Sequence, residues 1–79
     1  MSLTEKVCAI VAGVLKTEAN TLDSHSGLGV TPKWDSLNHT KLVLELEEVF
    51  DIEFDFSELD KIITVKAIVS SLEGKGVCS

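Results

Sequence analysis

The side chain best placed for chemistry is the hydroxyl of Ser36, which stands between Asp35 and Leu37. Asp is a favourable residue for capping a helix, so Ser36 falls in the first helical turn, at the end of a long loop where another protein can reach it. Unpaired backbone N–H groups and the positive end of the helix dipole would stabilise an anion attached there. The tripeptide therefore predicts a modification site.

A purely structural interpretation of the same tripeptide stays open, because Asp and Ser are common at helix starts and can serve only as caps. A reciprocal capping box needs Glu or Gln three residues after the cap, and Asn38 and His39 stand at those positions instead. We predict His39 to be a solvated surface residue. It is not assigned as a base for Ser36.

An acidic run from Asp51 to Asp60 raises the possibility of a calcium-binding loop. The sixth position of that loop would be Phe56, where a sharp turn needs Gly, and the twelfth would be Ile62, where a bidentate Glu is needed. The calcium hypothesis therefore fails, although surface carboxylates can still bind divalent cations weakly.

The sequence predicts neither a zinc site nor an enzyme. Zinc ligands occur at short spacings, and the candidate side chains here are far apart. They are Cys8, His25, His39 and Cys78. No nucleophile and base pair and no Gly-rich phosphate loop is recognisable.

The charge balance is strongly acidic, with 13 Asp and Glu residues, seven Lys, no Arg and a net charge of -6. Such a chain lacks the basic residues that bind nucleic acid, and it is expected to attract basic protein partners by electrostatic steering. The acidic residues are concentrated between Asp35 and Asp60, where Lys41 is the one base. They are Asp35, Glu45, Glu47, Glu48, Asp51, Glu53, Asp55, Glu58 and Asp60.

Length and composition predict one domain over residues 1–79, because a chain with 44% hydrophobic residues and one Pro belongs to the globular class. Two cysteines are too few for a disulfide framework, which favours a reduced, cytoplasmic protein. No apolar run is long enough to cross a bilayer, and no secretory leader is recognisable at Met1. We expect a soluble monomer that does not insert into membranes.

Apolar residues at helical spacing predict a first helix, which Ser2 with Glu5, or Thr4 alone, can cap. Its stripe consists of Val7, Ile10, Val11, Val14 and Leu15. A loop from Thr17 to Lys33 follows, rich in turn-forming residues. We expect its apolar residues to hold it against the core; these are Leu22, Leu28 and Val30.

Helical periodicity returns from Ser36 to Phe50, with Asp35 as the cap. The apolar residues of this stripe are Leu42, Val43, Leu46, Val49 and Phe50. The next segment alternates apolar and acidic residues, and without a partner strand we interpret it as an extended connector. Its inward residues are expected to be Ile52, Phe54 and Phe56.

Ser57 is predicted to cap one short turn through Lys61, and Thr64 to cap a last helix that ends near Gly74 and Gly76. The apolar stripe of this helix is Val65, Ile68, Val69 and Leu72. The tail from Lys75 to Ser79 is expected to be frayed. Together these elements predict an all-α fold: a small helical bundle of three main helices plus one short helix, with a long loop between the first two.

The tripeptide at Ser36 resembles the attachment motif of the acyl carrier proteins. The resemblance extends over Thr4 to Gly74 at matching spacings. Residues that resemble the family's second helix and its exit are Leu42, Leu46, Glu47, Phe50, Asp51, Ile52 and Glu53. Residues that resemble its entry into the last helix are Ile62, Ile63, Thr64, Val65 and Ile68.

This resemblance implies that a phosphopantetheinyl transferase moves a 4'-phosphopantetheine arm from coenzyme A to Ser36. Acyl groups are then carried as thioesters on the arm, and acyl-transferring or acyl-activating enzymes with basic surfaces are the partners. The resemblance implies recognition roles for five residues, Asp35, Leu37, Leu44, Glu47 and Glu48. Glu45 is interpreted as a solvated residue of the helix face.

The chain departs from many fatty-acid carriers of this family in having Asn38, His39 and Lys41 where acidic residues often follow the serine, and in the bulky Trp34 before the motif. The first three weaken the negative patch near the arm, which argues against the standard fatty-acid synthase enzymes as partners. Trp34 resembles carriers of specialised pathways that handle unusual acyl or aminoacyl groups; alternatively, it only anchors the loop. Two other functions stay open. One is an aminoacyl or peptidyl carrier, and the other is a non-covalent acidic helical interaction module, which would tolerate Ser36→Ala.

Overall fold

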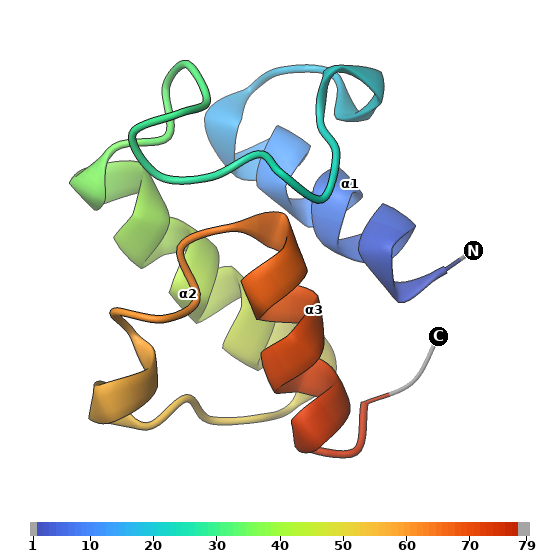
Figure 1. Cartoon of the computed structure of the whole chain (residues 1–79), viewed down its shortest axis with the longest axis vertical. Coiled ribbons are helices and arrows are strands. Elements are labelled where there is room, and N and C mark those ends of the chain that lie inside the picture. Colours follow the sequence, from blue (N-terminus) through green and yellow to red (C-terminus); the bar gives the residue numbers. More distant parts are fainter. Residues whose placement is uncertain (1, 78–79) are drawn as a thin grey trace.

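The computed structural model describes residues 2–77 of the chain and shows three principal helices (Figure 1). They are α1 (Leu3–Leu15), α2 (Ser36–Phe50) and α3 (Val65–Gly74). Two short 3-10 helices, η1 (Ala19–Thr21) and η2 (Phe56–Glu58), lie in the connecting segments. No β-strand occurs in residues 2–77, where the bridge between Gly27 and Thr64 is isolated. The predicted all-α fold is confirmed, with two short helices in place of one.

Each principal helix begins at a side-chain cap. Oxygen atoms of Ser2, Asp35 and Thr64 accept hydrogen bonds from the backbone N–H three residues later, at 2.9–3.1 Å. Thr4, the alternative cap for the first helix, lies inside α1. Such caps typically contribute about 1 kcal/mol each to the stability of the fold. The three predicted helix starts are confirmed.

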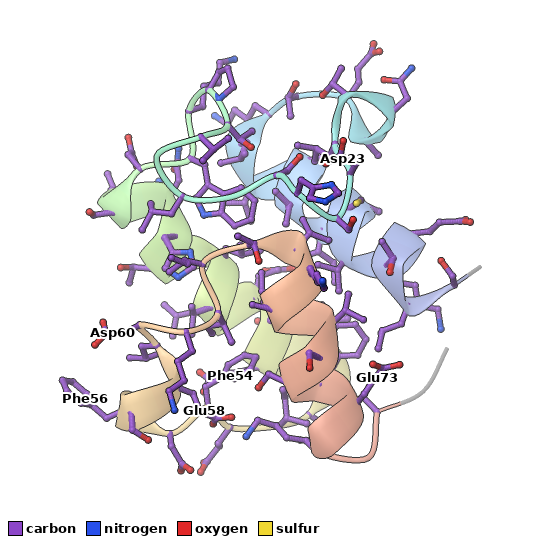
Figure 2. All side chains as sticks on the ribbon, viewed as in Figure 1. Asp23, Phe54, Phe56, Glu58, Asp60 and Glu73 are labelled. Atoms are coloured by element: carbon purple, nitrogen blue, oxygen red, sulfur yellow. The ribbon has the colours of Figure 1, made fainter. Side chains whose placement is uncertain are left out.

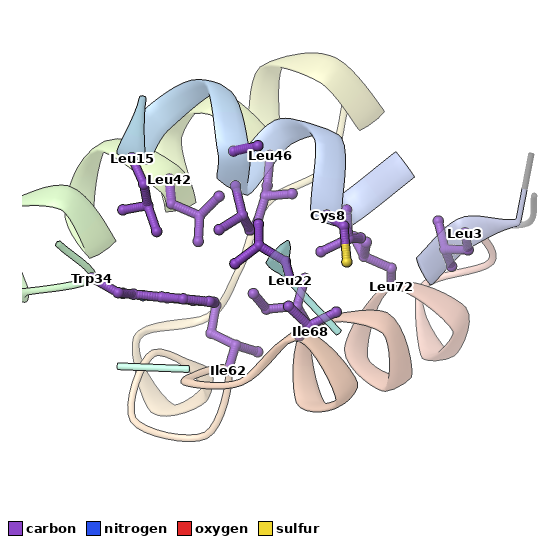
Figure 3. Close-up of a cluster of buried hydrophobic side chains, with 14 of the residues drawn as sticks. Leu3, Cys8, Leu15, Leu22, Trp34, Leu42, Leu46, Ile62, Ile68 and Leu72 are labelled. Atoms are coloured by element: carbon purple, nitrogen blue, oxygen red, sulfur yellow. The ribbon is translucent and has the colours of Figure 1, made fainter. Parts of the chain in front are cut away.

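Helix α1 contributes more buried side chains to the core than α2 or α3 and packs directly against both. Among their residues, all of which are described, α2 and α3 make no close backbone approach to each other. Buried side chains from the connecting segments complete the core (Figure 3). These are Leu22, Trp34, Phe54 and Ile62. The loops are therefore structural parts of the bundle.

The first loop differs from expectation at Val30. Leu22 is buried and Leu28 packs partly against the core, but Val30 is 76% exposed. The backbone N–H groups of Val30 and Thr31 both donate to the Gly27 carbonyl, which makes a tight turn with Val30 at its outer side. A residue in such a turn cannot reach the core, so the predicted inward position of Val30 is wrong.

Alternation in the connector after α2 also ends earlier than predicted. Phe54 is buried, whereas Phe56 is 89% exposed because it starts η2 and the chain turns there (Figure 2). The cap of this turn is Asp55, whose N–H donates to Glu58 Oε2 at 2.7 Å, so the assignment to Ser57 is wrong. Val49, at the edge of the α2 stripe, is 53% exposed.

The segment after α3 is held in place as far as Val77, so the predicted fraying is wrong for residues 75–77. Lys75 Nζ forms an ion pair with Glu58 Oε2 at 2.8 Å, and Ser71 Oγ donates to Glu58 Oε1 at 3.0 Å. The Val77 N–H donates to the Leu72 carbonyl, and its side chain packs against the core. Cys78 and Ser79, the rest of the predicted frayed tail, lie outside the described residues.

The first loop is joined to the start of α3 by backbone contacts around Gly27. The Leu28 N–H donates to the Ile63 carbonyl at 2.8 Å, and the Val65 N–H donates to the Ser26 carbonyl at 2.9 Å. A Cβ atom on Gly27 would lie 2.5 Å from the Ile63 carbonyl oxygen, which is closer than packed atoms approach. Gly27 is therefore required by close approach of two backbone segments.

We predict that Gly27→Ala destabilises the fold by about 1–3 kcal/mol, because the two segments must move apart. Gly13→Ala is the matched control: a Cβ there meets nothing within 4 Å, and Ala in a helix is favoured over Gly by up to about 1 kcal/mol. Urea unfolding of both variants measures the difference. Equal stability of the two variants would contradict the role of Gly27.

Glu58 makes stability dependent on pH in the acid range. The hydrogen bond from Lys75, together with the Asp55 backbone N–H and the Ser71 hydroxyl, lowers the pKa of Glu58 from 4.5 to about 2. Because the folded-state pKa lies below the unfolded-state pKa, this stabilisation is complete above about pH 4.5 and is lost as pH falls to about 2.

Glu58→Gln is therefore expected to lower stability at neutral pH and to flatten its decline between about pH 4.5 and pH 2. Denaturant unfolding at a series of pH values tests this, with Glu53→Gln in the same connector as the control. A Glu58→Gln profile parallel to that of the wild type over this range would show that Glu58 is not the responsible group.

Candidate functional site

Ser36 is exposed at the first position of α2, as the sequence predicts. Asp35 Oδ1 accepts a hydrogen bond from the Asn38 N–H at 2.9 Å, and the Asp35 carbonyl accepts from the His39 N–H at 2.8 Å. The Ser36 carbonyl accepts from the Thr40 hydroxyl at 3.0 Å. The first turn of α2 is thus firmly held while the Ser36 side chain faces outward, which suits a hydroxyl that receives a large group.

Asn38 stabilises the junction between the loop and α2. Its Nδ2 donates to the Lys33 carbonyl at 2.7 Å, and Lys33 has a positive φ of 71°. A residue other than Gly or Asn is uncommon in this left-handed conformation, so a side-chain hydrogen bond that fixes it is useful. Asn38, which departs from the family pattern, therefore has a local structural explanation.

Trp34 is buried, with 2% of its surface exposed, and its position confirms the interpretation that it anchors the loop. Its Nε1–H donates to His39 Nδ1 at 3.0 Å, and the two rings are stacked with centroids 6.1 Å apart. Figure 3 shows the indole among the core side chains, on the side of Leu15, Leu42 and Ile62. The largest side chain of the molecule thus sits two residues before the candidate site.

His39 is half-buried, so its prediction as a solvated surface residue is wrong. Burial lowers the pKa of His39, because the imidazolium is disfavoured away from water, while the Leu59 backbone carbonyl has a smaller opposite effect. Since Nδ1 already accepts from Trp34, this nitrogen is not available to take a proton from Ser36. The missed signal was an indole N–H five residues earlier that needs an acceptor when buried.

A cavity of about 480 Å³ opens beside Ser36, along one face of α2. Six residues of α2, spaced along one side of the helix, line it: Ser36, His39, Thr40, Val43, Leu44 and Glu47. The other wall comes from the connecting segments, with Leu28, Phe54, Leu59, Asp60 and Ile63. Most of these side chains are apolar, so the cavity suits a hydrocarbon chain with few polar groups. No pattern in the sequence predicts this cavity.

The residues assigned to partner recognition have different environments. Leu37 and Leu44 are 67% and 61% exposed, and Glu48 is also exposed. Glu47 is half-buried, and its Oε2 accepts a hydrogen bond from the Phe54 N–H at 2.9 Å. Glu47 thus has a structural role in holding the connector, whereas the other three remain accessible.

Positive charge also gathers at the N-terminal end of α2. A second depression there is lined by Lys16, Lys33 and Lys41 together with Asp35 and Asn38. The site therefore lies between this group of lysines and the acidic residues further along α2, a division that the overall charge of -6 does not reveal.

Other kinds of site find no support in the described part of the chain. Residues 2–77 contain no cluster of His, Cys, Asp and Glu suited to a metal ion. None of the helices described is long and apolar enough to cross a membrane. Cys8 is a buried free thiol, and burial raises its pKa, which opposes reactivity.

Comparison with known proteins shows which family this chain resembles. The family described as "Phosphopantetheine attachment site" matches residues 5–72. A protein named "Acyl carrier protein" from Prochlorococcus marinus (strain MIT 9515) is 38% identical over 71 residues, covering 90% of this chain and 89% of the relative. One of the same name from Helicobacter hepaticus (strain ATCC 51449 / 3B1) is 38% identical over 73 residues, covering 92% and 96%.

These matches cover nearly the whole chain and bear out its resemblance to the acyl carrier proteins. The cofactor of such proteins is covalently attached 4'-phosphopantetheine, and an exposed serine at a helix N-terminus beside an apolar cavity fits such a group. The chain belongs to the acyl carrier protein family, the carriers with a phosphopantetheine attachment site.

Proposed function

We propose that Ser36 is the attachment residue, and that this chain carries acyl groups on a 4'-phosphopantetheine arm bound to its hydroxyl. The observation that supports this most directly is the exposure of Ser36 at the capped start of α2, with a largely apolar cavity beginning beside it. The arm, when attached, supplies a terminal thiol that holds an acyl group as a thioester.

Ser36 is the acceptor in the loading reaction. Its Oγ forms a bond to the phosphorus that bears pantetheine, the diphosphate bond of coenzyme A breaks, and the adenosine phosphate half leaves. The hydroxyl proton passes to a base of the transferase, because His39, the imidazole in the same turn of α2, is engaged by Trp34. The chain itself is proposed to have no catalytic role, so its cycle depends on partner enzymes.

The resulting phosphodiester lies at the positive end of the α2 dipole, where backbone N–H groups stabilise negative charge. Asp35 maintains this end of the helix by capping it. Asp35 is also proposed to be read by the transferase.

The cavity beside Ser36 is proposed to receive the acyl chain. Val43, Leu44, Leu59 and Ile63 provide apolar surface for it. Each buried methylene group contributes about 0.8 kcal/mol, so a short chain already favours the cavity over water. Shielding the acyl chain in this way also keeps its apolar surface out of water.

Partners are proposed to be a phosphopantetheinyl transferase and acyl-handling enzymes with basic surfaces. Leu37, Leu44 and Glu48 present apolar and acidic groups for them on the exposed part of α2. Of the departures from the family pattern, Trp34 and Asn38 have structural explanations, whereas Lys41 is exposed. Lys41 is therefore the departure that can contact a partner, and a specialised pathway remains a prediction.

The aminoacyl or peptidyl carrier remains the second candidate, since it uses the same serine and differs only in cargo. A cytoplasmic location and a single domain over residues 1–79 remain predictions from composition and length. The non-covalent interaction module is disfavoured by the family match over residues 5–72.

Incubation with coenzyme A and a broad-specificity transferase is expected to add one phosphopantetheine to the wild type, and none to Ser36→Ala. Intact-mass measurement detects the addition. Ser57→Ala, which alters another exposed serine, is the control and is expected to load like the wild type. Loading of Ser36→Ala would refute the assignment of Ser36.

Filling the cavity is expected to weaken its hold on an acyl chain. In the loaded wild type, an octanoyl group should raise the thermal unfolding midpoint, because apolar surface is buried. Val43→Phe should remove most of that rise, because the Phe ring occupies the cavity. The stabilisation by octanoyl that is lost corresponds to about 2 kcal/mol or more. Val49→Phe, on the exposed side of α2, is the matched control. An equal octanoyl effect in both variants would show that the chain is held elsewhere.

A further inference from the structure

Three lysines from separate parts of the fold meet beside the start of α2. Lys16 follows α1 as its C-cap, Lys33 lies in the first loop and Lys41 belongs to α2. All three are exposed and line one depression of about 340 Å³, which we call the basic depression. Asp35 is the single carboxylate among the residues that line it. The net charge of the basic depression is therefore positive, on a chain whose net charge is -6.

The positive charge of the basic depression is not cancelled inside the protein. Within residues 2–77 the one ion pair joins Lys75 to Glu58, so none of the three lysines has a carboxylate partner. Asp35 caps α2 through its side chain. Glu45 stands one turn after Lys41, which is the less favourable order for an ion pair on a helix. The ammonium groups are thus available to a second molecule.

The backbone does not explain why lysine stands at two of these positions. Lys16 and Lys33 have positive φ angles of 57° and 71°, a conformation that favours Gly or Asn. The negative end of the α1 dipole favours a cation at Lys16, but Lys33 lies at no helix C-terminus. The side chain of Lys33, and not its backbone, is therefore the reason for a lysine in this turn.

Lys41 also belongs to an exposed stripe along α2. Leu37, Lys41, Leu44 and Glu48 follow one another at spacings of four, three and four residues, which places them on one face of the helix. All four are exposed. Glu48 lies about 10 Å beyond Lys41 along the helix axis. A partner that covers this stripe meets positive charge near Ser36 and negative charge further away.

We propose that the basic depression receives a carboxylate group of a partner protein. The exposed stripe of α2 thereby selects partners whose surface is acidic beside the active-site entrance and basic about 10 Å further out. A uniformly basic partner is disfavoured, because part of its charge meets the three lysines. A polyanion such as nucleic acid is repelled by the net charge of -6. The placing of the active-site entrance rests on the proposed attachment at Ser36.

Nuclear magnetic resonance of the lysine side chains tests the site in the intact, unloaded chain. Tetraglutamate is the carboxylate probe, and an oligonucleotide of the same charge is the comparison, both at low ionic strength because salt screens exposed charges. The signals of Lys16, Lys33 and Lys41 are expected to follow one binding curve with tetraglutamate. Lys61 and Lys66, which are exposed outside the basic depression, are expected to change little.

Two outcomes of this titration would overturn the proposal. Equal changes at all five lysines would show diffuse attraction without a site. Binding of the oligonucleotide as tight as that of tetraglutamate, or tighter, would show that the lysines do not select a carboxylate group.

A pair of variants separates a site from net charge. Lys41→Gln is expected to weaken tetraglutamate binding, followed at Lys16 and Lys33, about two- to fivefold, the effect of one exposed ion pair. Lys66→Gln removes the same charge outside the basic depression and is expected to leave the affinity unchanged. Both residues are exposed, so neither substitution alters the core. Equal weakening in the two variants would refute a site at the three lysines.

Loading by a phosphopantetheinyl transferase with a basic docking surface tests whether the basic depression meets a partner. Lys41→Glu is expected to raise kcat/KM for loading about two- to fivefold, because repulsion becomes attraction. Lys66→Glu has the same net charge and is expected to load like the wild type. Equal values for the two variants would overturn the docking role of Lys41. If intact mass shows that no form is loaded, the attachment at Ser36 is refuted instead, and the lysine titration still decides whether the basic depression binds carboxylate.

Discussion

Burial of the Trp34 indole two residues before Ser36 is the constraint on which the site depends. A large side chain in the core fixes the path by which the first loop enters α2, and Asp35 can then cap the helix and leave Ser36 outside. The indole N–H also needs an acceptor, which draws His39 inward. One packing requirement thus connects the position of the serine with the polarity of the neighbouring cavity.

The cavity wall opposite α2 is supported at both ends. Just before the wall residues Leu59 and Asp60, Glu58 is held by Lys75 and Ser71. At the end of this stretch, the Ile63 carbonyl accepts a hydrogen bond from the Leu28 N–H. Helices α2 and α3, both fully described, make no close backbone approach to each other, so the connecting segments and not α3 form the wall opposite α2. Lys75 also lies over the Phe54 ring at 5.4 Å from its centroid, which couples the end of α3 to the connector. A chain with room for one small core can in this way keep an opening beside its functional residue.

Much of the fold and part of the site could be predicted because the signals act over a few residues. The caps Ser2, Asp35 and Thr64 each bond three residues ahead, and the helix stripes repeat within a turn. The errors occur where an apolar residue fits the local pattern but the chain turns, so that its side chain faces solvent. Val30 lies in a tight turn, and Phe56 starts a new helical turn, so apolar character alone did not bring either inward. Burial is a property of the whole fold, and a turn can carry an apolar residue out to solvent.

The sequence by itself determined three capped helices, an acidic chain and Ser36 at the head of the second helix, because these follow from local propensity, charge and spacing. Only the tertiary structure decided that His39 is partly buried against Trp34, that Glu58 pairs with Lys75, and that a cavity lies beside Ser36. Glu58 and Lys75 are 17 residues apart, and the cavity joins residues of α2 to segments before and after it. Contacts of that range depend on how the helices pack, which no short stretch of sequence specifies.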